Sequence, residues 1–379
     1  MMSRPPLLDR RTFLRSTTGL LVGGSAWLVQ AGCDSGLPTA SDPAGDGGSG
    51  PDAPSSDSFC TIDEGLVFRA APRDGIPSLT DPPTTSPDGS GLGYLRPNDR
   101  VIGVVVNNDA LAVPLNILWW HEIVHAVVGG RRVAITHCPL TGSSLMFDRE
   151  PLDGVEFGVS GLLYLNNLMM YDRTDDASMW PQMERAARCG SRSGAELTML
   201  PVLETTWSGW KALWPHTRVL TSDTGWERSY HRYPYGPYDE PHSRELLFPL
   251  EGDIDVRRPP KERVLGIVDD RGAAAYPFGR LDEVGPAAAV PDGPHVIFWN
   301  RDARAAMAYF RTLDDRALSF EISNGDIVDA DTGSRWRIDG LAVSGPLEGR
   351  RLDPVPEAYV AYWFAWAAFH SDTFLWRSE

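Results

Sequence analysis

The chain has 379 residues, a length that predicts about two domains at roughly 100–200 residues per domain. Hydrophobic residues make up 42% and charged residues 23%, which excludes a fully disordered chain and a polytopic membrane protein. The net charge of −16 argues against nucleic acid as a partner, because phosphate binding needs a basic face, and against an electrostatic membrane patch.

The first 33 residues predict an export signal. Arg10 and Arg11 stand before an uncharged, Gly-rich stretch over 16–33, which is too short to span a membrane. The stretch ends in Ala-Gly-Cys33, which resembles the end of a lipobox, although Gln30 stands where Leu is usual. We therefore expect twin-arginine export and a lipid anchor on Cys33 at the periplasmic or extracellular face of the membrane. Cleavage by an ordinary signal peptidase is the alternative.

Residues 34–58 are almost entirely Asp, Gly, Ser, Pro, Ala and Thr, a composition that cannot bury a core. They predict a disordered tether, which is followed by an N-terminal arm over 59–98. With Cys33 used by lipid, an odd number of cysteines remains. A Cys60–Cys189 disulfide would leave Cys138 free, but the sequence does not decide the pairing.

The chain aligns with itself at an offset of 163 residues, which becomes 156 after a short deletion. The matches include rare tryptophans: Trp180, Trp207 and Trp210 align with Trp336, Trp363 and Trp366. They predict two related units over 99–222 and 261–379. A connector rich in Tyr and Pro, over 223–260, joins the two units.

Most local patterns are those of strands bounded by turn residues. Strands are expected over 132–137, 144–147 and 156–160, and the best helix candidates are 208–214 and 361–369. The predicted fold class is α+β and β-rich, with two internally duplicated β-rich units packed as a pseudo-symmetric pair.

Polar residues found in only one of the two units are candidates for function. The first unit has His121, Glu122, His137 and Cys138, where the second has Val284, Gly285, Asn300 and Arg301. Imidazole and thiolate, with the Met169 or Met170 thioether, are ligands that suit copper, zinc or iron. The sequence therefore places a candidate site in the first unit and a scaffold in the second. The alternative for Cys138 is a small buried hydrophobic residue.

The stretch from His121 to His125 reads His-Glu-Ile-Val-His, which on a helix would bind zinc and activate water. Its apolar alternation fits a strand about as well as a helix. No third histidine follows, because Val128 and Arg131 occupy the expected places. A zinc hydrolase is thus an alternative that depends on helical geometry.

Several long motifs are similar to one bacterial and archaeal family, the domain of unknown function numbered 3179. They include His121-Glu122-Ile123-Val124, His137-Cys138-Pro139-Leu140-Thr141-Gly142, Leu168-Met169-Met170-Tyr171-Asp172 and Trp180-Pro181-Gln182-Met183. The resemblance covers about 73–376 and implies no known activity. His121, Glu122 and Cys138 match its pattern, whereas His125 departs from a usual Asn. Thr141 stands where many members have a second Cys, so a two-Cys metal knuckle is not required.

Three functional hypotheses follow. The first is an exported metal-binding or redox protein with a site built from His121, Glu122, His137, Cys138, Met169 and Met170. The second is a non-catalytic binding or assembly lipoprotein in which these side chains are satisfied core residues. The third is the zinc hydrolase. The sequence does not decide whether the protein is an enzyme.

Overall fold

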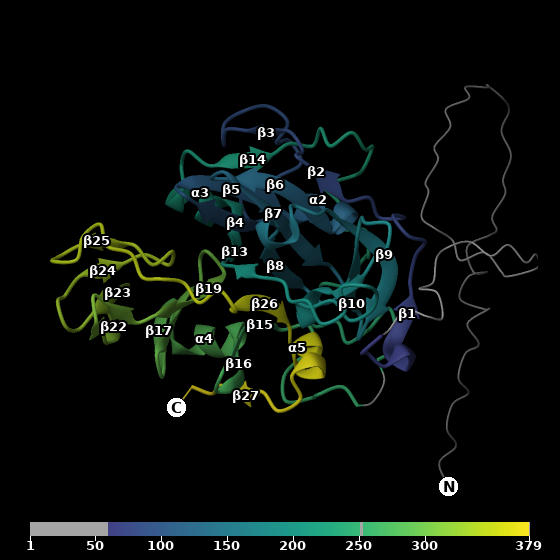
Figure 1. Ribbon diagram of the computed structural model, residues 1–379. Helices are drawn as coiled ribbons and strands as arrows, with labels where there is room; N and C mark the ends of the chain where they lie inside the picture. The colour runs from purple at the N-terminus through teal and green to yellow at the C-terminus, as the bar shows by residue number, and fades with distance from the viewer. Residues whose placement is uncertain (1–59, 251–252, 379) are drawn as a thin grey trace, which may run out of the picture. The chain divides into compact units, whose positions relative to one another are not determined.

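The structure is a computed structural model that describes residues 60–250 and 253–378 (Figure 1). The expected export signal, the lipid anchor on Cys33 and the tether over 34–58 lie outside the described residues. Within the described ranges, no helix combines the length and apolar character that a membrane crossing requires.

The fold is rich in β-structure, as the sequence predicted. About 40% of the described residues are in strands, and the same residues contain four α-helices. The helices are α2 (Leu115–His121), α3 (Trp207–Leu213), α4 (Phe278–Val284) and α5 (Trp363–Phe369). The helices expected over 208–214 and 361–369 are confirmed as α3 and α5. Helices α2 and α4 were not singled out, because their apolar patterns fit either kind of element.

The largest sheet has nine strands. Its order is β2 (Leu79–Thr80), β6 (Ile123–Val128), β7 (Arg131–Cys138), β8 (Ser143–Asp148), β26 (Tyr359–Tyr362), β15 (Arg263–Asp269), β16 (Gly272–Pro277) and β27 (Phe374–Leu375), while β12 (Met199–Leu200) pairs with β8. The strands expected over 132–137 and 144–147 are confirmed as β7 and β8.

Two further sheets come from the N-terminal arm and the first half of the fold. A five-stranded sheet has the order β13 (Leu203–Thr206), β4 (Arg100–Val106), β5 (Asp109–Pro114), β14 (Arg218–Leu220) and β3 (Thr84–Thr85). A four-stranded sheet has the order β1 (Val67–Arg69), β9 (Phe157–Tyr164), β10 (Asn167–Asp172) and β11 (Met179–Pro181).

The second half contains three smaller sheets. One consists of β17 (Ala287–Asp292), β18 (His295–Asn300) and β19 (Ala305–Phe310). Another consists of β22 (Phe320–Ser323), β23 (Asp326–Asp329), β24 (Arg335–Trp336) and β25 (Ala342–Ser344). The third pairs β20 (Thr312–Leu313) with β21 (Arg316–Ala317).

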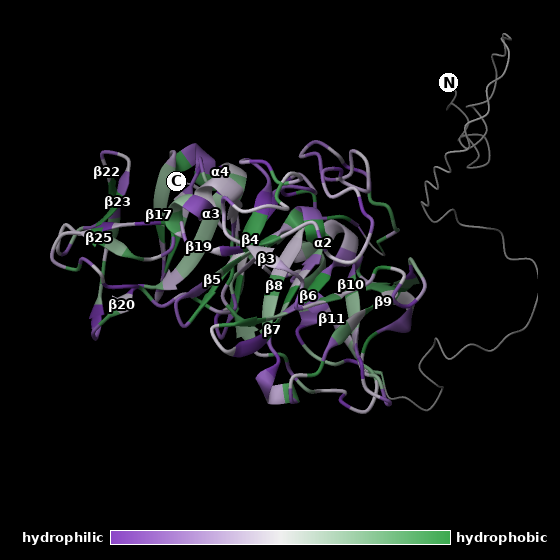
Figure 2. Ribbon diagram, turned by 90° about the horizontal axis from the view of Figure 1, so that it is seen from above, coloured by the Kyte–Doolittle hydropathy of each residue, from purple (hydrophilic) through white to green (hydrophobic). Residues whose placement is uncertain are grey.

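The nine-stranded sheet joins the two halves of the chain. Strand β8 of the first half pairs with β26 of the second, with Ser144 opposite Val360 (Figure 1). Its central strands are buried on both faces, so burial does not alternate from residue to residue along them. Figure 2 shows green, hydrophobic residues in the strands around β6 and β7 and a mixture of purple, white and green in the loops. The two halves therefore share one core region through this sheet.

Tryptophan packing fixes the sheets against the helices. The Trp210 ring lies so close to Gly103 that a Cβ at Gly103 would be 2.1 Å from a ring carbon. Trp366 packs in the same way on Gly266, where a Cβ would be 2.0 Å from the ring. Only a residue without a side chain permits these contacts.

The cysteines divide into one disulfide and one thiol among the described residues. Cys60 and Cys189 form a disulfide, which ties the N-terminal arm to the first half, and Cys138 is free and buried. The odd cysteine count had left this pairing open.

Candidate functional site

The candidate site begins where helix α2 ends and strand β6 begins. Pro114 starts the helix after β5, and His121 is its last residue. Glu122 then adopts φ 56° and ψ −32°, a conformation that residues with a side chain rarely adopt. Its N–H donates to Leu118 O at 2.8 Å, and its C=O accepts from His137 N at 2.8 Å. The backbone of this residue is thus held on both sides.

The Glu122 side chain is buried without a polar partner. The residue is only 4% exposed, and its carboxyl makes no hydrogen bond with the described part of the chain. Burial raises the pKa of Glu122 to about 8. The carboxyl is therefore mainly protonated and neutral at pH 7, which makes it a hydrogen-bond donor and not an anion.

Cys138 lies close to Glu122 at the end of strand β7. Its thiol is fully buried, and Sγ approaches Asn166 O at 3.8 Å. Burial, and next the charge of Glu122, raise the pKa of Cys138 to about 11. The backbone hydrogen bond from His137 N to Glu122 O places Cys138 near Glu122 in the chain fold, and a joint role of the two groups stays a prediction.

Tyrosines of the connector lie against this pair. Burial raises the pKa of Tyr235, and the negative charges of ionised Glu122 and Cys138 raise it further. The Tyr238 hydroxyl donates to Leu140 O at 2.8 Å, in the turn that follows Cys138. The connector thus covers the end of β7 with aromatic rings.

Lys261, at the start of the second half, contacts the connector. Its side chain is buried, and Nζ donates to Tyr238 O at 3.1 Å. Burial lowers the pKa of Lys261 to about 7. The neutral amine is therefore far more populated near neutral pH than it is for an exposed lysine.

His121 does not share the site of Cys138 as a free ligand. Its Nδ1 is 2.8 Å from Pro77 O and its Nε2 is 2.7 Å from the Tyr230 hydroxyl. Burial lowers the pKa of His121 to about 4, so the ring is neutral. With a carbonyl at Nδ1, that nitrogen carries the proton and Nε2 accepts from Tyr230. Both ring nitrogens are occupied.

The His-Glu-x-x-His geometry of a zinc hydrolase is not formed. His121 ends helix α2, whereas His125 lies on strand β6. His125 Nε2 accepts from Phe157 N at 2.9 Å, and Nδ1 is 3.4 Å from Thr80 Oγ1. The motif failed because Glu122 breaks the helix between the two histidines, which puts them on different elements.

His137 belongs to a buried ionic network. Its Nδ1 is 3.1 Å from Ser144 Oγ, which donates to Glu204 Oε2 at 2.6 Å. Glu204 Oε1 also accepts from Arg100 Nε at 2.6 Å and from Arg263 Nε at 3.1 Å. Although burial alone would raise the pKa of Glu204, these guanidinium groups lower it to about 2. Glu204 was missed in the sequence because nothing near it in the chain marks its partners.

The two methionines lie in different parts of the core. Met170 belongs to the apolar cluster that contains Cys138, whereas Met169 packs in the cluster around Cys189. The alternation of side chains along β10 separates them. Among the residues that the structure describes, no group of three or more His, Cys, Asp and Glu is arranged to hold a metal ion. The six expected ligands are therefore not gathered at one point.

A second group of polar side chains, also buried, follows Cys138. Asn167 Nδ2 donates to Thr141 Oγ1 at 3.0 Å and to Gln182 Oε1 at 2.9 Å. Ser143 Oγ donates to Gln182 Oε1 at 2.6 Å. The run of hydroxyl residues at Thr141 and Ser143 was the signal for this network. It fixes the turn that presents Cys138.

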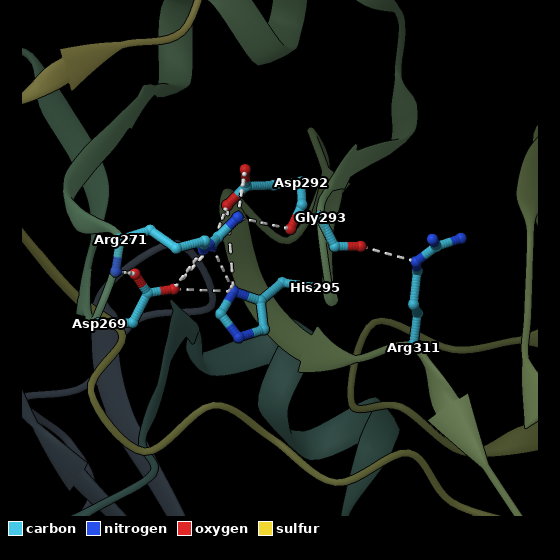
Figure 3. Close-up of polar contacts among 6 residues, drawn as sticks. All are labelled: Asp269, Arg271, Asp292, Gly293, His295 and Arg311. Carbon is cyan, nitrogen blue, oxygen red and sulfur yellow. Dashed lines mark hydrogen bonds and ion pairs between the residues drawn. The ribbon is translucent and has the colours of Figure 1, made fainter. Parts of the chain in front are cut away.

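The second half has its own polar cluster, at the tips of two hairpins. Figure 3 shows Arg271 between Asp269 and Asp292, with the His295 ring beside it. Arg271 Nη2 is 2.6 Å from Asp269 Oδ2 and 2.9 Å from Asp292 Oδ2. Arg311 Nε donates to Gly293 O at 2.8 Å. These contacts join the β15–β16 turn to the β17–β18 turn.

One family model matches the chain. It is described as "Protein of unknown function (DUF3179)" and matches residues 73–373, which confirms the resemblance found in the sequence. No curated protein and no solved structure matches the chain.

Proposed function

Since the chain belongs to the DUF3179 family of unknown function, we propose its activity from the site alone. The protein is an exported, lipid-anchored protein whose reactive centre is the Cys138 thiol with the Glu122 carboxyl beside it. Its chemistry is that of a redox or metal-binding thiol. The observation that supports this proposal is the state of Glu122.

Glu122 combines two unfavourable features at one residue. A positive φ at a residue with a side chain costs about 1–3 kcal/mol. Burial of the carboxyl, which also raises its pKa, adds a desolvation penalty of about 1–3 kcal/mol. Natural proteins rarely keep such a group unless it has a role. The one free thiol among the described residues lies next to it.

The pair suits controlled thiol chemistry. The thiolate, and not the thiol, is the nucleophile and the metal ligand. With a pKa of about 11, Cys138 is almost wholly protonated at pH 7. A metal ion that binds Sγ displaces the thiol proton, which passes to solvent, or to the Glu122 carboxylate at a pH where that group is ionised. The connector tyrosines limit access to this centre.

The test measures the rate of alkylation of Cys138 by iodoacetamide against pH. We expect a slow reaction whose apparent pKa lies well above the ordinary thiol value. Glu122→Gln should lower that pKa, because it removes the negative charge that disfavours the thiolate. Cys138→Ser supplies the background rate. An identical pH profile for wild type and Glu122→Gln would exclude coupling between the two groups.

Metal binding is the second candidate, because Cys138 and Met170 are soft donors in one apolar cluster. Elemental analysis of protein purified after native export tests it. Bound copper, zinc or iron should be lost in Cys138→Ser and Met170→Leu. Met169→Leu is the matched control, since Met169 packs in another cluster. Equal metal content in all variants would place the metal elsewhere.

Export and lipidation remain proposals from the sequence. Replacing Arg10 and Arg11 with Lys should leave the precursor inside the cell. Cys33→Ser should release unlipidated protein from the membrane. Fractionation and a lipid label on Cys33 measure the two effects, and normal export of the Lys variant would contradict the twin-arginine route.

We further propose that the two halves arose by duplication. Two pairs of matching hydrogen bonds support this. In the first pair, Trp210 Nε1 donates to Thr217 Oγ1 at 3.0 Å and Trp366 Nε1 donates to Thr373 Oγ1 at 2.9 Å. In the second pair, Trp180 Nε1 donates to Asp172 Oδ2 and Trp336 Nε1 donates to Asp329 Oδ2, both at 3.0 Å. Helices α2 and α4 both have seven residues and follow a proline. Superposition of 100–217 on 263–373 with these tryptophans in equivalent places is the test.

A further inference from the structure

A pocket lies between the two halves, away from Glu122 and Cys138. Its volume is about 310 Å³, at the lower end of the range for small-molecule sites. Strand β4 and helix α3 contribute one wall, and β19 with the segment after β25 contributes the other. Trp210, Trp214 and Tyr309 give the pocket an aromatic lining. Such a lining favours a flat, apolar ligand.

Two charged residues, Asp339 and Arg351, line the pocket. Asp339 is buried and accepts hydrogen bonds from both Arg337 and Arg351. One carboxylate thus faces two guanidinium groups. Arg351 bonds Asp339 only through Nη1, at 2.6 Å to the carbonyl and 3.3 Å to Oδ2. Its Nε and Nη2 have no partner in the described part of the chain.

The polar groups of the aromatic side chains that line the pocket are hydrogen-bond donors. The Tyr309 hydroxyl donates to Ile338 O, and Trp210 Nε1 donates to Thr217 Oγ1. The Trp214 Nε1 donor, in contrast, is buried with no acceptor among the described residues. The Arg351 guanidinium lies 5.5 Å from the Trp214 ring centroid. The unpaired Trp214 Nε1 and the partly exposed Arg351 guanidinium therefore belong to neighbouring side chains that both line the pocket.

We propose that this pocket binds a small aromatic carboxylate. The ring of the ligand packs against Trp210, Trp214 and Tyr309. Its carboxylate accepts from Arg351 Nε and Nη2, which can bind two oxygens side by side. The site is separate from the Glu122–Cys138 centre and does not depend on the function proposed for that centre.

The test uses benzoate as the probe and calorimetry or ligand-observed NMR as the readout, on the full mature chain. Benzamide has the same shape without the charge, and acetate has the charge without the ring. We expect benzoate to bind at least about tenfold more tightly than either, as the loss of a charge-assisted bond or of ring packing predicts. Equal binding of benzamide and benzoate, or no benzoate binding at ~10 mM, would overturn the proposal.

Two arginine variants locate the site. Arg351→Met keeps much of the apolar stem and should weaken benzoate binding about tenfold or more. Arg350→Met removes the same charge from the neighbouring residue, which pairs with Asp314 at 2.7 Å, and should leave binding unchanged. Equal losses in both variants would mean a general charge effect and would contradict the assigned pocket. If Arg351→Met does not fold, the benzoate–benzamide comparison on wild type still decides.

Discussion

Helices α2 and α4 both end shortly before a strand, but the residue that follows each helix has a different backbone conformation. Each of these helices has seven residues, follows a proline with φ near −65° and is followed by a strand. After α4 the next residue is Gly285, in an extended conformation with φ 162° and ψ −178°. After α2 it is Glu122, at φ 56°.

The difference teaches where function is to be sought. A glycine after a helix is inexpensive and says little, because it adapts to many backbone conformations. A buried, unpaired glutamate at a positive φ is unfavourable in both its backbone and its side chain. In the first half, this unfavourable residue, Glu122, lies near the free thiol of Cys138. Variants of Glu122 and Arg271 test features found in one half, whereas variants of Glu204, Gly103 and Gly266 test features that involve both halves.

The largest change in stability should come from Glu204, whose carboxylate forms ion pairs with an arginine of each half. Glu204→Gln leaves Arg100 and Arg263 without a charged partner and should lower the free energy of unfolding by about 3–5 kcal/mol. Because the pKa of Glu204 is lowered to about 2, its stabilisation is present above pH 4.5 and is lost as pH falls towards 2. Urea denaturation between pH 2 and 7 measures both.

The control for Glu204 is Glu184→Gln, which removes a partly exposed ion pair with Arg188 and should change stability by less than about 1 kcal/mol. Similar losses in the two variants would mean that the shared carboxylate has no special role.

Glu122→Gln should stabilise the protein, with a strong dependence on pH. The pKa of Glu122 is raised from 4.5 to about 8, so its stabilising contribution is present below pH 4.5 and is lost as pH rises through 8. The variant should match wild type near pH 4 and exceed it by about 3 kcal/mol at pH 7. Glu321→Gln, an exposed change, is the control. A pH-independent difference would contradict the buried neutral acid.

The tryptophan contacts should respond alike in the two halves. Gly103→Ala and Gly266→Ala each force a Cβ against a buried indole and should lower stability by about 1–3 kcal/mol. Gly93→Ala meets no atom within 4 Å and should be near neutral. Thermal unfolding of the three variants measures this, and a large inequality between the first two would weaken the proposed duplication.

The smallest effect should come from the hairpin clamp of the second half. Arg271→Ala breaks partly exposed ion pairs and should cost about 0–1 kcal/mol. Burial, and next Arg271, lower the pKa of His295, so the variant should raise that pKa. An NMR titration of the His295 ring measures the shift. An unchanged pKa would mean that the contact drawn in Figure 3 is not formed in solution.

Local sequence predicted the elements better than it predicted the site. Strands β7 and β8 and helices α3 and α5 follow from turn residues, β-branched runs and tryptophan spacing, which act within a few residues. Glu122 and Cys138 were selected because one half has them and the other lacks them, and their role stays a prediction.

The rest of the site depended on contacts between distant segments. The Tyr230 hydroxyl is hydrogen-bonded to Nε2 of His121, and the Pro77 carbonyl is hydrogen-bonded to Nδ1. Neither partner can be inferred from the residues around His121. Met169 and Met170 were treated together, although neighbours on a strand point to opposite faces. The sequence therefore predicted the types of chemical group and not their directions.

The shared nine-stranded sheet sets the order in which this chain can fold. Strand β8 finds its neighbour β26 only after nearly the whole polypeptide has been synthesised, because Ser144 pairs with Val360. Pairings so distant in sequence close slowly. A nascent or truncated chain that stops before β26 would present unpaired edges of β8 and β15, which invite aggregation. Folding is thus expected to be a property of the completed chain, with neither half able to mature as an autonomous unit.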